Sequence, residues 1–305
     1  MSYLVGKYYS QRALLSFKSK HWNLSKKIET EKDYESVFSE FDVVIVGSDQ
    51  IWNSSCISIM GLFYYGINAN IAKQKLIAYA PSFGKGVFVT EEENIRTLKR
   101  HLSSFHAISV REDDGIHLLR NVFNINHAVK VLDPTMLMDR KYYMSIAGIK
   151  KLQRRATLAY YLLDKTDEKI NYVNEMAKRL NLTPVNMYLS DKSDNSFLSK
   201  LKSLKYPSVE YWIKCIAESQ MVITDSFHGT VFSIIFNRDF LTFGNERRGN
   251  SRFISLLSMF ALNDRLICGH NAPESKFPQI DYTSVNCKLN DLKIESRQFL
   301  NNALL

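Results

Sequence analysis

Residues 221–236 read MVITDSFHGTVFSIIF, and they combine both elements of an α/β fold in one short stretch. A short apolar run ends in an Asp-Ser turn, and a second apolar run follows a His-Gly pair. Nearly continuous apolar runs of this length are typical of strands buried on both faces, which belong to parallel sheets covered by helices. We therefore expect a buried strand, a polar turn and a helix, and the turn raises the question of what His228 does.

The same succession of strand, turn and helix recurs along the chain. Between the strand-like runs, apolar side chains recur every three or four positions, which is the spacing of amphipathic helices. Two groups of such runs predict an α/β protein with two Rossmann-like domains, each with a parallel sheet, divided as residues 1–140 and 141–305. The expected strands are residues 41–46, 75–80, 105–110, 127–132, 155–163, 184–189, 221–224 and 240–244, and the expected helices include 92–105, 167–181, 208–219, 251–260 and 289–305.

Composition limits the classes of protein. The four cysteines lie far apart in the 305 residues, so neither a zinc site nor a disulfide framework is expected, and reduced thiols fit a cytoplasmic protein. No apolar run is long enough to span a membrane, and the N-terminal residues lack the apolar core of a secretory signal. The net charge of +9 fits general solubility, an anionic substrate or an anionic membrane surface. The basic residues are spread along the chain, which argues against nucleic-acid binding.

Candidate binding residues follow the expected strands, because ligands of open parallel sheets bind beyond the carboxyl ends of the strands. In the segment GSDQ, Gly47 permits a positive φ or a close approach of the backbone, and Ser48 or Asp49 can cap the next segment. This segment, which ends in Gln50, does not match a nucleotide-binding fingerprint. A capped turn without any ligand would have the same sequence.

Two further turns in the first half carry groups that suit an anion. Ser82 and Lys85 lie in the segment SFGKG, which is also compatible with a solvated loop. Arg111 follows another expected strand, and its guanidinium can bind two phosphate or carboxylate oxygens at once. Alternatively, Arg111 forms a surface ion pair with Glu112, which would contribute little to stability.

The Asp-Ser-Phe-His-Gly turn carries more candidate groups. Asp225 or Ser226 is placed to cap the following helix, whose first turn contains Gly229 and Thr230. The unpaired N–H groups and the dipole of a helix start favour an anion. His228 could serve there as a general acid, a general base or an anion ligand. The alternative is a structural histidine, and the residues alone leave both interpretations open.

A basic turn also follows the next expected strand. The segment NERRGNSRF places Arg247, Arg248 and Arg252 around a glycine at an expected helix start. Such a segment can hold a phosphate or a carboxylate, although a solvated basic loop has the same composition.

Taken together, these segments resemble the polysaccharide pyruvyl transferase family. The resemblance covers about residues 15–270, and the set of motifs is specific, whereas each motif alone would be weak. The segments that occur in the order and spacing of that family are FDVVIVGSDQIWN, KLIAYAPSFGKG, FHAISVREDDG, VLDPTML, MVITDSFHGTVFSIIFNRDFLTF and RRGNSRFISLLSMFALNDRLI.

The resemblance implies a GT-B-like fold with the active site in the interdomain cleft. It implies transfer of a pyruvyl group from phosphoenolpyruvate to two hydroxyls of one sugar, which forms a ketal on a bacterial surface glycan or exopolysaccharide. The acceptor would be a glycan or a lipid-linked sugar, and no metal or organic cofactor is implied. Such an enzyme would work in the cytoplasm or at the inner face of the membrane, with peripheral membrane association.

The resemblance also implies roles for the candidate residues. His228 is the leading acid/base candidate, and Asp49 is a second catalytic candidate in the first domain. The implied donor-binding residues are Arg111, Ser226, Gly229, Thr230, Arg247, Arg248 and Arg252, and the implied acceptor-side residues are Gly47, Ser48, Gln50, Ser82 and Lys85.

The sequence departs from the family pattern at two points. Many members have Arg-Leu before the His-Gly pair, where this chain has Ser-Phe, so one donor-binding arginine is either missing or supplied by residues 247–252. Members also usually begin with a further strand–loop–helix unit, which this chain is expected to lack. Two alternatives are a nucleotide-sugar glycosyltransferase on the same fold, which predicts tight nucleotide binding, and a shortened non-catalytic glycan-binding relative, which predicts folding without turnover.

Overall fold

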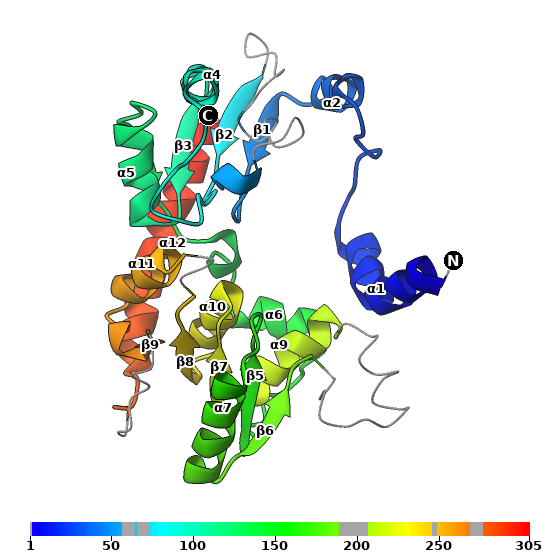
Figure 1. The fold of residues 1–305 in the computed structure, drawn as a ribbon, viewed down its shortest axis with the longest axis vertical. Helices are drawn as coiled ribbons and strands as arrows, with labels where there is room; N and C mark the ends of the chain where they lie inside the picture. Colours follow the sequence, from blue (N-terminus) through cyan, green and yellow to red (C-terminus); the bar gives the residue numbers. More distant parts are fainter. Residues whose placement is uncertain (1, 57–64, 66–73, 189–206, 246–248, 269–276) are drawn as a thin grey trace. The chain divides into compact units, whose positions relative to one another are not determined.

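The computed structural model describes all residues except 1, 57–64, 66–73, 189–206, 246–248 and 269–276. The strands of the described residues form a four-stranded sheet, ordered β1-β2-β3-β4, and a five-stranded sheet, ordered β6-β5-β7-β8-β9 (Figure 1). Every neighbouring pair of strands in both sheets is parallel. The expected α/β class with two parallel sheets is therefore confirmed.

The chain divides into two compact units, each built around one sheet. We call Ser25–Leu137, Gly244–Asn263 and Asp281–Leu305 the N-sheet unit, and Met1–Leu24, Met138–Phe243 and Asp264–Ile280 the C-sheet unit. The boundary expected after residue 140 places residues 1–24 in the first domain and residues 244–263 and 281–305 in the second. In the structure, residues 1–24 belong to the C-sheet unit, and residues 244–263 and 281–305 belong to the N-sheet unit. Local periodicity indicates that a segment is helical but carries no information about which sheet the helix covers.

The N-sheet unit has its hydrophobic core on one face of its sheet. Strand residues such as Leu76 and Ile108 point to that face and pack with Leu98 of α4. Removing each such side chain from water stabilises the fold by roughly 1.5–3 kcal/mol. The strands are β1 (Val43–Val46), β2 (Lys75–Ala78), β3 (Ala107–Val110) and β4 (Val129–Lys130), and the helices are α2 (Glu31–Phe38), α4 (Glu92–Leu102), α5 (Asp113–Asn121), α11 (Ser251–Met259) and α12 (Tyr282–Leu304).

The last helix, α12, covers the other face of the first sheet. Tyr79 continues β2 on the face opposite Leu76, and its ring packs against Phe299 of α12. The backbone N–H of Leu132 donates to Ser296 Oγ of α12 at 3.0 Å. The final helix predicted from the sequence therefore exists, and it belongs to the sheet formed by the first half of the chain.

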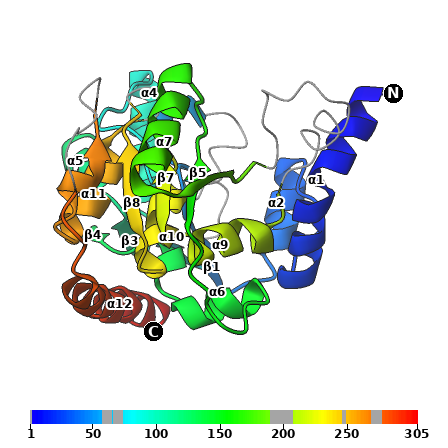
Figure 2. The same ribbon diagram turned by 90° about the horizontal axis from the view of Figure 1, so that it is seen from below.

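The C-sheet unit is covered by helices on both faces of its sheet (Figure 2). Leu158 of β5 packs with Val173 of α7 on one face, whereas the next residue, Ala159, faces the side of α9 that carries Cys215. The strands are β5 (Thr157–Tyr161), β6 (Thr183–Asn186), β7 (Met221–Thr224), β8 (Asp239–Phe243) and β9 (Leu266–Ile267), and the helices are α1 (Ser2–His21), α6 (Arg140–Ile146), α7 (Asp167–Leu180), α9 (Val209–Glu218) and α10 (Phe227–Ile235).

Short 3₁₀ turns complete the described secondary structure, at Ser54–Cys56, Pro134–Met136 and Asn263–Arg265. None of the helices in the described ranges combines the length and the apolar character that crossing a membrane requires.

Candidate functional site

The strand order of the C-sheet unit identifies one point of its sheet as a ligand-binding position. The chain runs from β5 to β6 on one side and then returns to β7 on the other side of β5. Beyond the carboxyl ends of β5 and β7, this reversal opens the crevice in which doubly wound sheets bind their ligands. Residues 225–230 follow β7 directly, so this turn lies at the reversal point.

Ser226 caps the helix that begins at this point. The backbone N–H of Gly229 donates to Ser226 Oγ at 3.4 Å, so Ser226 is the cap, one of the two candidates predicted. The neighbouring Asp225 is buried and accepts hydrogen bonds from the N–H of Leu163 at 2.5 Å and from Lys169 Nζ at 2.7 Å. Asp225 thus fixes the turn after β5 to α7, which is a structural role.

Gly229 and Thr230 attach α10 to the sheet. A Cβ on Gly229 would lie 2.4 Å from Thr224 Oγ1, so the helix approaches β7 this closely only with glycine. Thr230 Oγ1 shares a hydrogen bond of 2.8 Å with Thr242 Oγ1 of β8, and its side chain is fully buried. Their contribution to donor binding, predicted from the resemblance, stays a prediction.

His228 differs from its neighbours in exposure. Every other residue from 221 to 235 is buried, whereas His228 is half-buried. Its ring lies 5.5 Å from the ring of Phe227, nearly perpendicular to it. A histidine that only filled the core would be enclosed like the residues around it. His228 is instead accessible in the first turn of α10, at the reversal point of the sheet.

In the N-sheet unit, Arg111 is the centre of a buried ion network. Its side chain is 1% exposed, and its Nη1 and Nη2 donate to Asp133 Oδ2 at 2.6 Å and to Asp49 Oδ1 at 2.8 Å. Burial lowers the pKa of Arg111, but the charges of Asp133, Glu112 and Asp49 outweigh burial and raise it above its usual value. The alternative of a weak surface pair with Glu112 is therefore wrong, because the Arg111 side chain is paired away from solvent.

Glu112 fixes the SFG segment beside this network. Its Oε1 accepts hydrogen bonds from Ser82 Oγ at 2.7 Å and from the N–H of Phe83 at 2.9 Å. The pKa of Glu112 is raised because burial disfavours the charged form, although the charge of Arg111 opposes the shift. The acceptor-side candidate Ser82 is fully buried, so its hydroxyl serves this internal bond.

The GSDQ turn joins the same network. Gly47 has φ of 143°, and a Cβ there would lie 2.0 Å from the carbonyl oxygen of Tyr79, so glycine is required. Asp49 is 61% exposed at its side chain while it accepts from Arg111. Gln50, with its amide oxygen turned toward the guanidinium, accepts from Nη1 and Nη2 of Arg252 at 2.6 and 3.0 Å. Between Gly47 and Asp49, Ser48 is half-buried.

The residues before α11 lie close to the SFG segment, residues 82–84. Gly249 approaches so closely that a Cβ there would lie 2.1 Å from the carbonyl oxygen of Gly84 and 3.2 Å from the side chain of Lys85. Lys85 is exposed, and Arg252 is buried. The N-cap residue, Asn250, makes no side-chain capping bond to this helix. Arg247 and Arg248 lie outside the described residues.

The N-sheet unit therefore brings several predicted residues together within one network. Gly47, Asp49, Gln50, Ser82, Arg111 and Arg252 are linked through hydrogen bonds or close backbone approach. In the described part of the chain, no group of three His, Cys, Asp or Glu side chains could hold a metal ion.

Sequence reasoning missed the roles of Glu112 and Asp133 in this network. Both residues follow an expected strand, as Asp49 and Arg111 do, so their positions carried the same signal. Asp133 precedes a proline close to the expected boundary at residue 140, where a simple connection between domains would have the same composition. In the structure, Asp133 also caps the 3₁₀ turn Pro134–Met136 by accepting from the N–H of Thr135 at 3.0 Å.

Comparisons with known proteins complete this description. A search of curated proteins found no significant match. Among solved structures, a functionally uncharacterised protein from Klebsiella pneumoniae subsp. pneumoniae NTUH-K2044 is 16% identical, with 87% of this chain and 88% of that chain covered and a TM-score of 0.47. The wall teichoic acid polymerase TagF is 14% identical, with 97% of this chain and 80% of that chain covered and a TM-score of 0.39. The family model of polysaccharide pyruvyl transferases matches residues 3–247, which is most of the chain, and this chain therefore belongs to the polysaccharide pyruvyl transferase family.

Proposed function

We propose that this enzyme transfers a pyruvyl group from phosphoenolpyruvate to two hydroxyls of one sugar and forms a ketal on a bacterial surface glycan or exopolysaccharide. Family membership over residues 3–247 supports a transferase with a sugar or glycan acceptor. The observation that carries the proposal further is the exposure of His228, the half-buried residue in an otherwise buried strand, turn and helix. An accessible imidazole at a ligand-binding position is suited to proton transfer.

The reaction sets the requirements for the site. One sugar hydroxyl adds to C2 of phosphoenolpyruvate as the methylene carbon gains a proton and becomes a methyl group. Phosphate then leaves, and the second hydroxyl of the same sugar forms the second bond to C2 and releases its proton. The site must therefore supply an acid, a base and positive groups that stabilise the departing phosphate.

His228 is the proposed acid/base residue. The positive end of α10 favours a bound anion next to the imidazole. The imidazolium would donate to the methylene carbon, and the neutral ring would accept a proton from a hydroxyl. Asp49, whose carboxylate is well exposed, is a second candidate for accepting a hydroxyl proton.

On the donor side, Arg252 is the best-supported cation. Its guanidinium contacts the neutral amide of Gln50, whereas Arg111 contacts the carboxylates of Asp49 and Asp133. Arg252 also interacts electrostatically with the buried Glu112, and its position in the first turn of α11 places it at a helix start that favours an anion. Arg111 would then act by positioning Asp49, and Arg247 and Arg248 stay donor-side candidates.

The acceptor side is proposed to include the GSDQ and SFGKG turns. Asp49 and Lys85 have exposed side chains that could contact sugar hydroxyls. Gly47, Ser48, Gln50 and Ser82 would shape the turns that carry these two residues. A lipid-linked acceptor would bring the enzyme to the inner face of the membrane, where the net charge of +9 would favour anionic lipids.

The test is phosphate release from phosphoenolpyruvate in the presence of a panel of nitrophenyl glycosides and lipid-linked sugars. We expect release that requires both substrates and falls by at least about a hundredfold in His228→Ala. Release that is unchanged in His228→Ala would remove this residue from the mechanism.

Donor binding can be tested without an acceptor. Phosphoenolpyruvate at about a hundred times its Kd should stabilise the wild type by about 2.7 kcal/mol, which a thermal shift detects. Arg252→Leu should lose most of this stabilisation, whereas the matched control Arg100→Leu, at an exposed position of α4, should keep it. Equal stabilisation of both variants would contradict the role of Arg252.

A further inference from the structure

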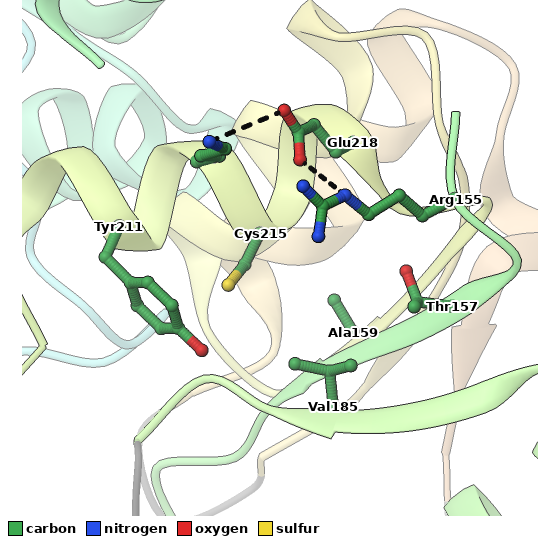
Figure 3. A pocket seen from close by; sticks show the side chains of 8 residues that line it. Arg155, Thr157, Ala159, Val185, Tyr211, Cys215 and Glu218 are labelled. Carbon is green, nitrogen blue, oxygen red and sulfur yellow. Dashed lines mark ion pairs between the residues drawn. The ribbon is translucent and has the colours of Figure 1, made fainter. Parts of the chain in front are cut away.

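The C-sheet unit contains a pocket that is distinct from the turn after β7. It has a volume of about 290 Å³ and lies between α9 and the strands β5 and β6 (Figure 3). This volume is close to the lower limit of about 300 Å³ for small-molecule sites. Thr157 is the first residue of β5, so the pocket extends toward the amino ends of the strands, whereas His228 follows the carboxyl end of β7.

One end of the pocket carries an excess of positive charge. Glu218 is nine-tenths buried at its side chain and lies between two cations, with Arg155 Nε at 2.8 Å and Lys214 Nζ at 3.9 Å. The backbone N–H of Arg155 also donates to the carbonyl oxygen of Glu218 at 2.8 Å, which fixes this end in place. A single carboxylate facing two cations leaves a net positive site.

The guanidinium of Arg155 is placed to bind an anion. Its ion pair with Glu218 uses Nε, and one of its two terminal nitrogens points away from Glu218, on the side of α9 that carries Cys215 (Figure 3). No hydrogen bond joins these terminal nitrogens to a residue in the described ranges. Two parallel N–H donors on a planar guanidinium match the oxygens of a carboxylate or a phosphate.

The rest of the pocket is largely apolar. Ala159 and Val185 form its floor on the sheet, and Tyr211 and Cys215 line it from α9 (Figure 3). Burial raises the pKa of Tyr211 to about 12, and burial also raises the pKa of the Cys215 thiol, so both side chains are neutral at physiological pH. A ligand with a charged end and a short apolar body would match both parts of the pocket.

We propose that this pocket binds a small amphipathic anion, a carboxylate or phosphate attached to a short apolar chain. The anionic end contacts Arg155 and Lys214, and the apolar chain lies against Ala159, Val185 and the ring of Tyr211. The proposal is independent of the transfer reaction, because none of these residues belongs to the turn after β7 or to the N-sheet unit.

Cys215 reports on occupancy of the pocket without a turnover assay. The probes are hexanoate and hexyl phosphate, with hexanol and hexylamine as neutral and cationic controls. Labelling by N-ethylmaleimide is followed for each cysteine by mass spectrometry, and the exposed Cys287 is the internal reference. We expect at least one anion to slow labelling of Cys215 several-fold, with Cys287 unchanged and with no effect of hexanol or hexylamine. Whichever anion protects better identifies the preferred head group.

Variants separate ion recognition from general packing. Arg155→Gln should abolish protection by the anions, whereas Arg154→Gln, at an exposed neighbouring position outside the pocket, should retain it. Val185→Phe, on the edge strand β6, should also abolish protection by filling the apolar floor. The absence of protection by both anions in the wild type, equal protection by hexanol, or full protection in Arg155→Gln would each overturn the proposal.

Discussion

Two of the residues selected from the sequence occupy opposite environments. His228 is half-buried in a buried neighbourhood, whereas the Arg111 side chain is 1% exposed and held by carboxylates. A residue that reacts with a substrate must be reachable, and a residue that holds charges inside the protein must be enclosed. The environments therefore favour a chemical role for His228 and a positioning role for Arg111.

We expect the ion network around Arg111 to contribute strongly to the free energy of unfolding. Arg111→Leu leaves Asp133 as a buried and uncompensated charge, which we expect to cost about 3–5 kcal/mol of unfolding free energy. The comparison is Arg96→Leu, which removes an exposed pair with Glu92 at 3.8 Å and should cost less than about 1 kcal/mol. Urea unfolding of the wild type and both variants measures the difference, and equal losses would show that the Arg111 network is not stabilising.

Among the helices, α10 depends on its cap. Ser226→Ala removes the acceptor for the N–H of Gly229 and should cost about 1 kcal/mol, while Ser226→Asn should retain most of the stability. Thermal unfolding of the two variants measures this. If Ser226→Asn is as unstable as Ser226→Ala, the side chain is required for packing and not for capping.

The helices α5 and α11 are joined through Asp113. Asp113 N–H donates to Ser255 Oγ at 2.9 Å, and that hydroxyl donates to Asp113 Oδ2 at 3.0 Å. Lys130 of β4 also donates to Asp113 Oδ1 at 2.6 Å. This contact holds the helix of residues 251–259 on the first sheet, although in sequence it lies between β8 and β9 of the second sheet.

Asp113 therefore makes stability depend on pH. Burial alone would raise the pKa of Asp113, but the hydrogen bond and charge of Lys130 and the bond from Ser255 outweigh it, so the pKa lies below 3.8. A lowered carboxyl pKa gives a contribution that is present above pH 3.8 and is lost as pH falls through the folded-state value. The stability advantage of the wild type over Asp113→Asn in urea unfolding should hold at neutral pH and shrink below pH 4. A constant advantage across this range would contradict the assignment.

At the level of elements, the sequence predicted most of the fold. The helix expected at residues 208–219 is Val209–Glu218, and Ser208 caps it by accepting from the N–H of Tyr211 at 3.1 Å. By contrast, the strand expected at residues 127–132 is Val129–Lys130 alone, and both of its residues are exposed. Hydrophobic periodicity and turn residues are local features of a sequence. They therefore predict that a helix or strand exists more reliably than they predict where it begins and ends.

Contacts between distant segments could not be predicted in this way. Leu180 follows the buried Ala177 at the spacing of an amphipathic helix but is 44% exposed at the last position of α7. The contact of Arg252 with Gln50 joins residues from different halves of the chain, and nothing in either segment specifies its partner. The candidate residues were found by their positions at strand ends, whereas their pairing required the fold.

For the whole molecule, the last helix returns to the first sheet. Deletion of residues 281–305 removes Ser296 and Phe299 of α12 and exposes one face of the N-sheet unit. We expect faster amide hydrogen exchange in residues 75–78 and 107–110, with no change in residues 157–161. Equal acceleration in both sheets would show that the two units do not unfold separately.

The most direct test of the proposed function is to follow the carbon atoms of the donor. The enzyme is incubated with phosphoenolpyruvate labelled with ¹³C at C2 and with the glycoside panel, and the sugar products are analysed by NMR and mass spectrometry. We predict that the label appears in a ketal carbon bonded to two sugar oxygens, together with an equal amount of phosphate, and that His228→Ala forms none. Label that remains in phosphoenolpyruvate while the sugar gains another group, or ketal formation at the wild-type rate in His228→Ala, would contradict the account.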